Sequence, residues 1–212
     1  MIFQDRVDAG RQLGEKLQQF KDVQNAIVIG LPRGGVPVAY EVAKALNAPL
    51  EVVVPRKVGM PGQPELAVGA VCEDGTVIFN DSLLRMAKLS PDDLQPIVEK
   101  EKQEAQRRLK EYRGGRPELD LKDKVVILVD DGIATGATMR AAIASAQAKG
   151  AQKIIVAVPV LPPDTLEALQ DTVDEVIYLD APAYFGAVGM FYRNFGQTQD
   201  DQVVALMEQA SK

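Results

Sequence analysis

The sequence predicts an α/β fold, a three-layer α/β/α arrangement around a mostly parallel central sheet. Short apolar runs without polar alternation, such as residues 26–29, 125–129 and 154–160, are typical of strands buried on both faces. Segments with helical spacing separate these runs, and glycine or proline punctuates the boundaries. In sheets built this way, ligands bind beyond the carboxyl ends of the strands.

The N-terminal elements alternate between helix and strand. Incomplete helical spacing of apolar residues predicts a helix over 5–20, and the apolar run 26–29 predicts the strand that follows. A second helix is expected over 36–46, after a loop rich in glycine, and a second strand over 50–54.

Turn signals define the middle of the chain. Strands over 68–72 and 76–79 flank an Asp-Gly pair, which favours a hairpin turn. The stretch that begins at Ser90, with proline next and two acids after it, is typical of a helix start. This helix is expected to run towards Tyr112 and to stop by Gly114, with a solvated charged face.

The C-terminal half continues the alternation. A continuous apolar strand over 125–129 precedes an alanine-rich helix over 138–149, which Gly150 closes. Strands over 154–160 and 176–179 are separated by a helix that begins near residue 163. We expect a single domain over 1–212, because no repeat, low-complexity stretch or interdomain linker interrupts it.

Composition excludes several classes of protein. The chain has 212 residues, a formal net charge of −6, one cysteine and no histidine. The absence of histidine excludes Ser-His and Cys-His nucleophile systems and most zinc sites. The acidic balance disfavours nonspecific binding of nucleic acid. Without a membrane-length apolar segment or a secretory signal, we expect a cytoplasmic protein with no membrane partner.

The segment 125–138 carries the strongest functional signal. A buried strand ends in two acids, and the chain then passes through two glycines and two threonines into a helix, whose free amide groups attract phosphate. Acids beside a phosphate site fit a sugar diol or a bridging magnesium, although a helix cap or an ordinary polar strand end is the plain alternative. The expected binding residues are Asp130, Asp131, Gly132, Ile133, Ala134, Thr135, Gly136, Ala137 and Thr138.

This segment resembles the signature of the type I phosphoribosyltransferases, and the order of strands and loops agrees over about residues 26–179. The resemblance implies that Asp130 and Asp131 hold the ribose hydroxyls of phosphoribosyl pyrophosphate and bind Mg²⁺, the expected cofactor. The loop 132–138 would wrap the 5′-phosphate. A small-molecule acceptor is the implied second substrate.

Two further loops fit the same family. The loop 30–35 resembles the pyrophosphate loop, with a possible cis peptide at Pro32–Arg33, and makes Arg33, Gly34 and Gly35 candidate binding residues. The glycine- and proline-rich stretch 55–65 resembles a mobile lid that brings Arg56 and Lys57 to the pyrophosphate and excludes water. A simple turn and an ordinary exposed loop are the respective alternatives. We expect Arg33, Lys57 and Asp131 to be catalytic.

The acceptor site is the least defined part. In the family it lies under a variable hood, here expected from the N-terminal helix and residues 180–200, while 80–122 is a candidate helical insertion. The aromatic residues of the hood suit a planar base, a small core or a dimer contact equally well. Ala134 stands where purine-salvage members carry an acid, so either another group such as Glu65 or Tyr184 serves the acceptor, or the acceptor needs no such group.

The expected function is therefore magnesium-dependent transfer of ribose 5-phosphate to an unidentified, heterocyclic base. The alternative is a regulator that binds phosphoribosyl pyrophosphate without turnover. A phosphatase or sugar-phosphate isomerase would explain the glycine-threonine loop but not the loops of Arg33 and Lys57. The acceptor, the pathway and a homodimer are left open.

Overall fold

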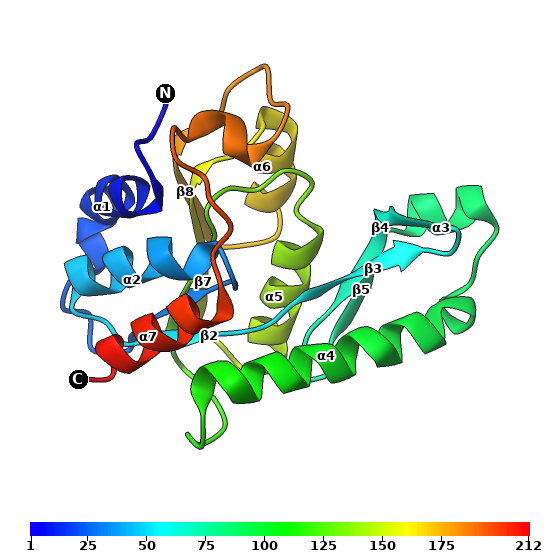
Figure 1. Ribbon diagram of the computed structural model, residues 1–212, viewed down its shortest axis with the longest axis horizontal. Coiled ribbons are helices and arrows are strands. Elements are labelled where there is room, and N and C mark those ends of the chain that lie inside the picture. The colour runs from blue at the N-terminus through cyan, green and yellow to red at the C-terminus, as the bar shows by residue number, and fades with distance from the viewer.

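The computed structural model describes residues 1–212 and has two parts, an α/β core and an arm that projects from one side of it (Figure 1). The core contains a five-stranded parallel sheet in the order β2-β1-β6-β7-β8. Its strands are β1 (Ala26–Gly30), β2 (Leu50–Val52), β6 (Val125–Val129), β7 (Lys153–Val160) and β8 (Glu175–Asp180). The predicted α/β fold with a mostly parallel sheet is confirmed.

Helices cover both faces of this sheet, as the continuous apolar strands predict. One face is covered by α1 (Arg6–Lys16), α2 (Gly35–Leu46) and α7 (Asp200–Ala210), and the other by α5 (Ala137–Ala148) and α6 (Pro163–Gln170). Successive residues of each strand point into opposite layers. In β6, Ile127 packs with the first set of helices, whereas Val126 and Leu128 pack with the second.

The strand order reverses between β1 and β6, which places a crevice at the carboxyl ends of these two strands. Their register pairs Gly30 with Val129, so both strands end at the same level. The loop after β1 and the loop after β6 therefore start side by side. This edge is where the sequence analysis expects a ligand to bind.

The arm is a small antiparallel sheet backed by a long helix. Its elements are β3 (Arg56–Met60), β4 (Gln63–Val71), β5 (Val77–Phe79), α3 (Asp81–Ala87), a 3₁₀ turn (Pro91–Leu94) and α4 (Gln95–Arg113). Six buried residues form its own core, namely Val58, Val68, Val71, Leu84, Leu94 and Val98. The predicted hairpin and the capped start at Ser90 are confirmed, while α3 had not been predicted separately.

The prediction of an irregular loop over 55–65 is wrong, because these residues form β3 and the start of β4. Gly62 has φ +81°, which a tight hairpin turn requires and glycine tolerates. The register shifts at Gly59, where a Cβ atom would lie 2.4–3.0 Å from the backbone of Pro64. Glycine and proline thus mark a turn and a bulge in a hairpin.

The start of the chain pairs with the segment that precedes α7. Short 3₁₀ turns occur at Gln18–Phe20 and Val188–Phe191, and Phe3 pairs with Tyr192 through an isolated bridge. Residues 181–199 thereby cross the carboxyl edge of the sheet and lie against the N-terminus. None of the helices is both long and apolar enough to cross a lipid bilayer.

Candidate functional site

The glycines of the loop after β1 allow it to touch the acidic pair after β6. A Cβ atom on Gly35 would lie 2.9 Å from Asp130 Oδ1 and 2.9 Å from the carbonyl oxygen of Val129. A Cβ atom on Gly34 would overlap the carboxylate of Asp131. The same loop contains a cis peptide at Pro32–Arg33, as the family resemblance implied. Two of the predicted segments are therefore in direct contact.

Burial shapes the electrostatics of the two acids. Burial raises the pKa of Asp130, and the neighbouring charge of Asp131 raises it further. Burial also raises the pKa of Asp131, but Arg6 opposes this effect. Asp130 Oδ1 accepts the Asp131 N–H at 2.8 Å, so the two side chains have different environments.

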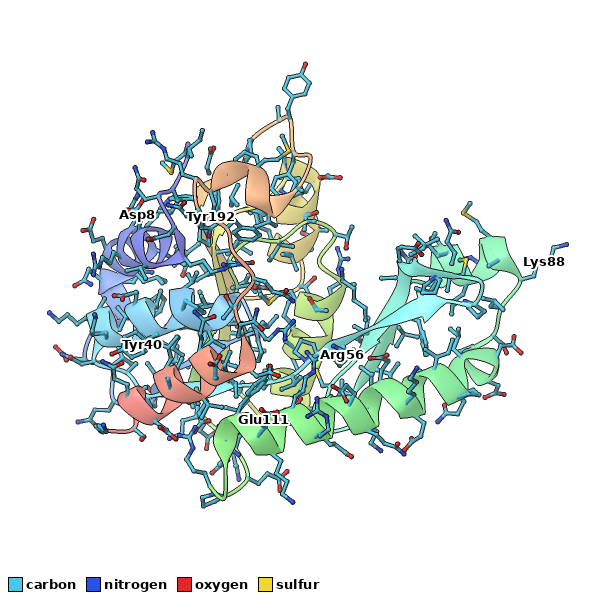
Figure 2. All side chains as sticks on the ribbon, viewed as in Figure 1. Asp8, Tyr40, Arg56, Lys88, Glu111 and Tyr192 are labelled. Carbon is cyan, nitrogen blue, oxygen red and sulfur yellow. The ribbon has the colours of Figure 1, made fainter.

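Arg6 is a site residue that the sequence reasoning missed. Its Nε atom lies 3.0 Å from Asp131 Oδ2, and the two side chains are 13% and 14% exposed. From the C-terminal segment, whose Tyr192 is labelled in Figure 2, the Tyr192 hydroxyl donates a hydrogen bond to the Asp131 carbonyl oxygen at 2.6 Å. Both contacts join residues far apart in the chain, so no local pattern signals them.

The loop after β6 leads into a helix start whose amide groups no side chain caps. Gly136 precedes the helix with φ +84°, and no side chain caps its first amide groups. The first turn of α5 also lacks an acid, so the N-terminal end of the helix keeps its positive potential. Thr135 is exposed beside it, while the Ile133 N–H donates to the Val160 carbonyl oxygen and anchors the loop.

The remaining residues of this predicted loop pack against neighbouring elements or lie in the first turn of α5. Gly132 packs against Val188, where a Cβ atom would lie 2.6 Å from a methyl group. The Ala134 carbonyl oxygen accepts a hydrogen bond from Thr165 Oγ1 at 2.8 Å. Ala137 and Thr138 are partly buried in the first turn of α5.

Arg33 lies in a cavity of about 390 Å³ at the crevice, together with Arg6, Gly34 and Asp131. Its Nη1 atom is 3.6 Å from Asp200 Oδ1, at the start of α7. Asp200 is a second residue that sequence reasoning missed. The cavity thus places Arg33 beside Asp131 of the acidic pair.

The structure separates Arg56 from Lys57, because neighbouring residues of a strand point to opposite faces. Arg56 Nε pairs with Glu101 Oε2 on α4 at 2.8 Å (Figure 2). Lys57 lines another cavity, of about 690 Å³, between the arm and the start of α5, which Thr135 also lines. Lys57 and Arg33 therefore face different cavities, and Arg56 faces neither of them.

Two further arginines line the cavity of Lys57. These are Arg85 of α3 and Arg140 of α5, whose Nη1 atom donates to the Thr135 carbonyl oxygen at 3.1 Å. None of these three cations has a carboxylate oxygen within 4.0 Å, in contrast to Arg33 and Arg56. The sequence could have pointed to Arg140, because it is a basic residue about one turn into the helix that follows the predicted phosphate loop.

The aromatic residues of the hood mostly form a small core. Phe3 and Tyr192 are buried together, and Phe185 stacks on Phe191 with ring centroids 5.2 Å apart. Tyr184 is 94% exposed. Of the three uses left open, a small core is the one these contacts favour.

Ala134 lines a third cavity, of about 570 Å³, with Phe185 and Asp164 on its walls. Neither substitute considered for its missing acid, Glu65 or Tyr184, lines this cavity. The acidic residue that does line this cavity is Asp164, in the first turn of α6. The sequence reasoning overlooked Asp164 because it lies 30 residues beyond the loop.

The chain contains no group of three or more acidic, cysteine or histidine residues that would hold a metal ion. Mg²⁺ commonly takes only one or two carboxylates from a protein and completes its shell with waters and substrate phosphates. The adjacent carboxylates of Asp130 and Asp131 fit that donor set, with the salt bridge from Arg6 as a competitor for one of them.

The site therefore combines an acidic pair, a glycine-rich contact and an uncapped helix start at the switch point of a parallel sheet. The chain belongs to the phosphoribosyl transferase domain family, whose model matches residues 4–191. A solved structure, that of TT1426 from Thermus thermophilus, is 40% identical, with 99% of both chains covered and a TM-score of 0.83.

Two curated relatives are similar in sequence. "Putative phosphoribosyl transferase Rv0571c" from Mycobacterium tuberculosis is 49% identical over 211 residues, which cover 100% of this chain and 47% of the relative. This chain therefore spans about half the length of that relative. "Bifunctional protein PyrR" from Clostridium acetobutylicum is 31% identical over 141 residues, covering 66% of this chain and 60% of the relative.

Proposed function

We propose that this chain transfers ribose 5-phosphate from phosphoribosyl pyrophosphate to a heterocyclic base and releases pyrophosphate. The observation that carries the proposal is the contact between the Arg33–Gly35 loop and the acidic pair at the switch point. This contact brings a cation that can bind an anionic leaving group, Arg33, next to carboxylates that can bind a diol. A simple phosphate-binding protein would have no use for both.

The pyrophosphate end of the substrate would lie in the cavity that Arg33 and Gly34 line. Arg33 offers a planar guanidinium group, which suits paired phosphate oxygens. Its ion pair with Asp200 is long, at 3.6 Å, so a phosphate that binds Arg33 more strongly can replace it. Arg33 thus serves the departing group.

The sugar and the 5′-phosphate would follow the loop after β6. The carboxylates of Asp130 and Asp131 accept hydrogen bonds from ribose hydroxyls and stabilise positive charge on the ring. The uncapped start of α5 and Thr135 receive the 5′-phosphate. Lys57 and Arg140, which have no carboxylate partners, lie on the arm side of that phosphate.

In the proposed reaction, the bond between ribose C1 and the pyrophosphate oxygen breaks as a bond from C1 to an acceptor nitrogen forms. Pyrophosphate leaves with the electron pair of the broken C1–O bond and takes up the proton that the acceptor nitrogen loses. Mg²⁺, held by Asp130 or Asp131 and by substrate oxygens, would supply positive charge to the pyrophosphate. The cavity beside Ala134, with the Phe185 ring on its wall, suits a flat acceptor.

The test is a pyrophosphate-release assay with phosphoribosyl pyrophosphate, Mg²⁺ and a panel of purines, pyrimidines and related heterocycles. We expect release that depends on one acceptor and stops when EDTA is added. Binding of phosphoribosyl pyrophosphate without turnover across the panel would instead support the regulator. Absence of binding would refute the proposed function.

A further inference from the structure

Arg6 occupies a position that helix stability does not explain. It is the first residue of α1, after the N-cap Asp5, whose carboxylate accepts the Asp8 N–H at 2.8 Å. Cations are disfavoured in the first turn of a helix, because the helix dipole is positive there. The side chain is nevertheless only 13% exposed. Its placement therefore needs a reason outside the helix.

Three contacts hold the guanidinium group of Arg6. Its Nε–H donates to Asp131 Oδ2 at 3.0 Å, and its Nη1 donates to the Gly196 carbonyl oxygen at 2.6 Å. The guanidinium carbon lies 4.0 Å from the centre of the Phe195 ring, a cation–π contact. Only a planar fork with several donors makes all three contacts at once, so lysine is no substitute.

The surrounding backbone fixes both ends of this arrangement. The Phe3 N–H donates to the Phe191 carbonyl oxygen, and the Arg193 N–H donates to the Phe3 carbonyl oxygen, each at 2.8 Å. These bonds tie the start of the chain to the segment that carries Phe195 and Gly196. Arg6 is thus held from two sides against one carboxylate of the acidic pair.

Asp131 has a particular need for such a partner. It lies next to Asp130, and two neighbouring carboxylates in a partly buried site repel each other. Its Oδ2 atom also occupies the space that a side chain on Gly34 would take. If the Asp131 carboxylate adopted another orientation, it would no longer lie against the loop of Gly34.

We propose that Arg6 is a positioning residue that orients the Asp131 carboxylate towards the hydroxyls of the bound ribose. The inference rests on the proposed function, because it requires a ribose at Asp131. Arg6 would act through Asp131 and leave the phosphate contacts at α5 to other groups. Loss of Arg6 should therefore weaken recognition of the sugar while sparing recognition of the 5′-phosphate at the start of α5.

The experiment compares ribose 5-phosphate with inorganic phosphate by isothermal titration calorimetry. In Arg6→Gln we expect about a tenfold higher Kd for ribose 5-phosphate, the scale of one lost charge-assisted hydrogen bond. The Kd for phosphate should stay within about twofold. Arg6→Lys should follow Arg6→Gln, because it keeps the charge but not the fork.

Arg11→Gln is the matched control, since Arg11 lies on the same helix, is 67% exposed and faces Glu41 at 3.8 Å. It should bind both ligands as the wild type does, and circular dichroism should show all variants folded. Equal weakening of both ligands in Arg6→Gln, or no weakening, would overturn the positioning role. A wild-type protein that binds neither ribose 5-phosphate nor phosphoribosyl pyrophosphate would overturn the proposed function and this role together.

Discussion

The carboxyl edge of the core sheet and the arm both carry residues assigned to the substrate, but they hold them differently. At the core edge, Asp131 is in contact with Arg6, with Tyr192 and with the loop of Gly34. On the arm, Lys57 stands exposed on a bulged edge strand and has no ion-pair partner. The core supplies a preorganised site, whereas the arm supplies a cation that is free to meet a ligand.

This difference predicts that substitutions at the core edge and on the arm will have different kinds of effect. Residues of the core edge share contacts, so changing one of them alters the orientation of the others. The arm has its own small core and meets the α/β core mainly beside α5 and α7. Its variants should separate charge effects from stability effects more cleanly.

The largest effect is expected for Asp131→Asn. An amide keeps the shape but removes the negative charge that we propose faces the ribose, so we expect at least a 100-fold loss of turnover, on the order of one lost preorganised electrostatic contact. Steady-state pyrophosphate release measures it. Asp171→Asn, at an exposed position, is the matched control and should be active. A variant at residue 131 that is as active as this control would refute the role of Asp131.

A smaller effect is expected for Lys57→Gln on the arm. Removal of an unpaired cation from the cavity beside Thr135 should lower kcat/KM about tenfold, the scale of one charge-assisted contact. The stability of the protein should change little, because Lys57 has no ion pair to lose. An unchanged kcat/KM would mean that the arm does not serve the substrate.

Asp130→Asn should stabilise the fold while it impairs function. Because burial raises the pKa of Asp130, the folded chain binds this proton more tightly than the unfolded chain does. The wild type should therefore lose stability as pH rises from the unfolded value, about 4, through the raised folded value. The amide removes this loss and should raise the free energy of unfolding by about 1 kcal/mol at pH 8. A gain of this size is typical when an unfavourable group in a functional site is replaced.

Urea unfolding of Asp130→Asn and wild type at pH 5 and pH 8 checks this prediction. The difference in unfolding free energy between the two proteins should be larger at pH 8. If the variant is less stable than the wild type at pH 8, the carboxylate is a stabilising group and the account of the acidic pair fails.

The smallest effect is expected for Arg56→Gln, the neighbour of Lys57. Its partly exposed pair with Glu101 should contribute roughly 0.5–1 kcal/mol to the stability of the arm. Urea unfolding should show this loss, and the loss of kcat/KM should be smaller than for Lys57→Gln. The reverse order of activity would mean that Arg56, and not Lys57, turns towards the substrate.

The sequence was most informative where local rules decide structure. The continuous apolar runs of β1 and β6 predicted the parallel sheet, and the acids, glycines and threonines after β6 predicted the loop at its edge. The hairpin of β3 and β4 was misjudged because the same glycines and prolines suit a loop, a turn or a bulge. Without that hairpin, the opposite directions of Arg56 and Lys57 were not predictable.

Contacts between distant parts of the chain were beyond local rules. Arg6 and Asp131 are 125 positions apart, and a cation in the first turn of a helix carries no signal of its partner. Asp200 meets Arg33 only because α7 returns to the carboxyl edge of the sheet. The Asp164 carboxylate reaches the cavity of Ala134 in the same way, through the packing of α6.

The most direct test of the central claim is calorimetric titration of phosphoribosyl pyrophosphate, with Mg²⁺ present, into the wild type and Asp131→Asn. We predict saturable binding at one site per chain in the wild type and a severe loss of affinity in the variant. Absence of binding to the wild type, or equal binding to both proteins, would contradict a sugar-phosphate site at the meeting point of β1 and β6.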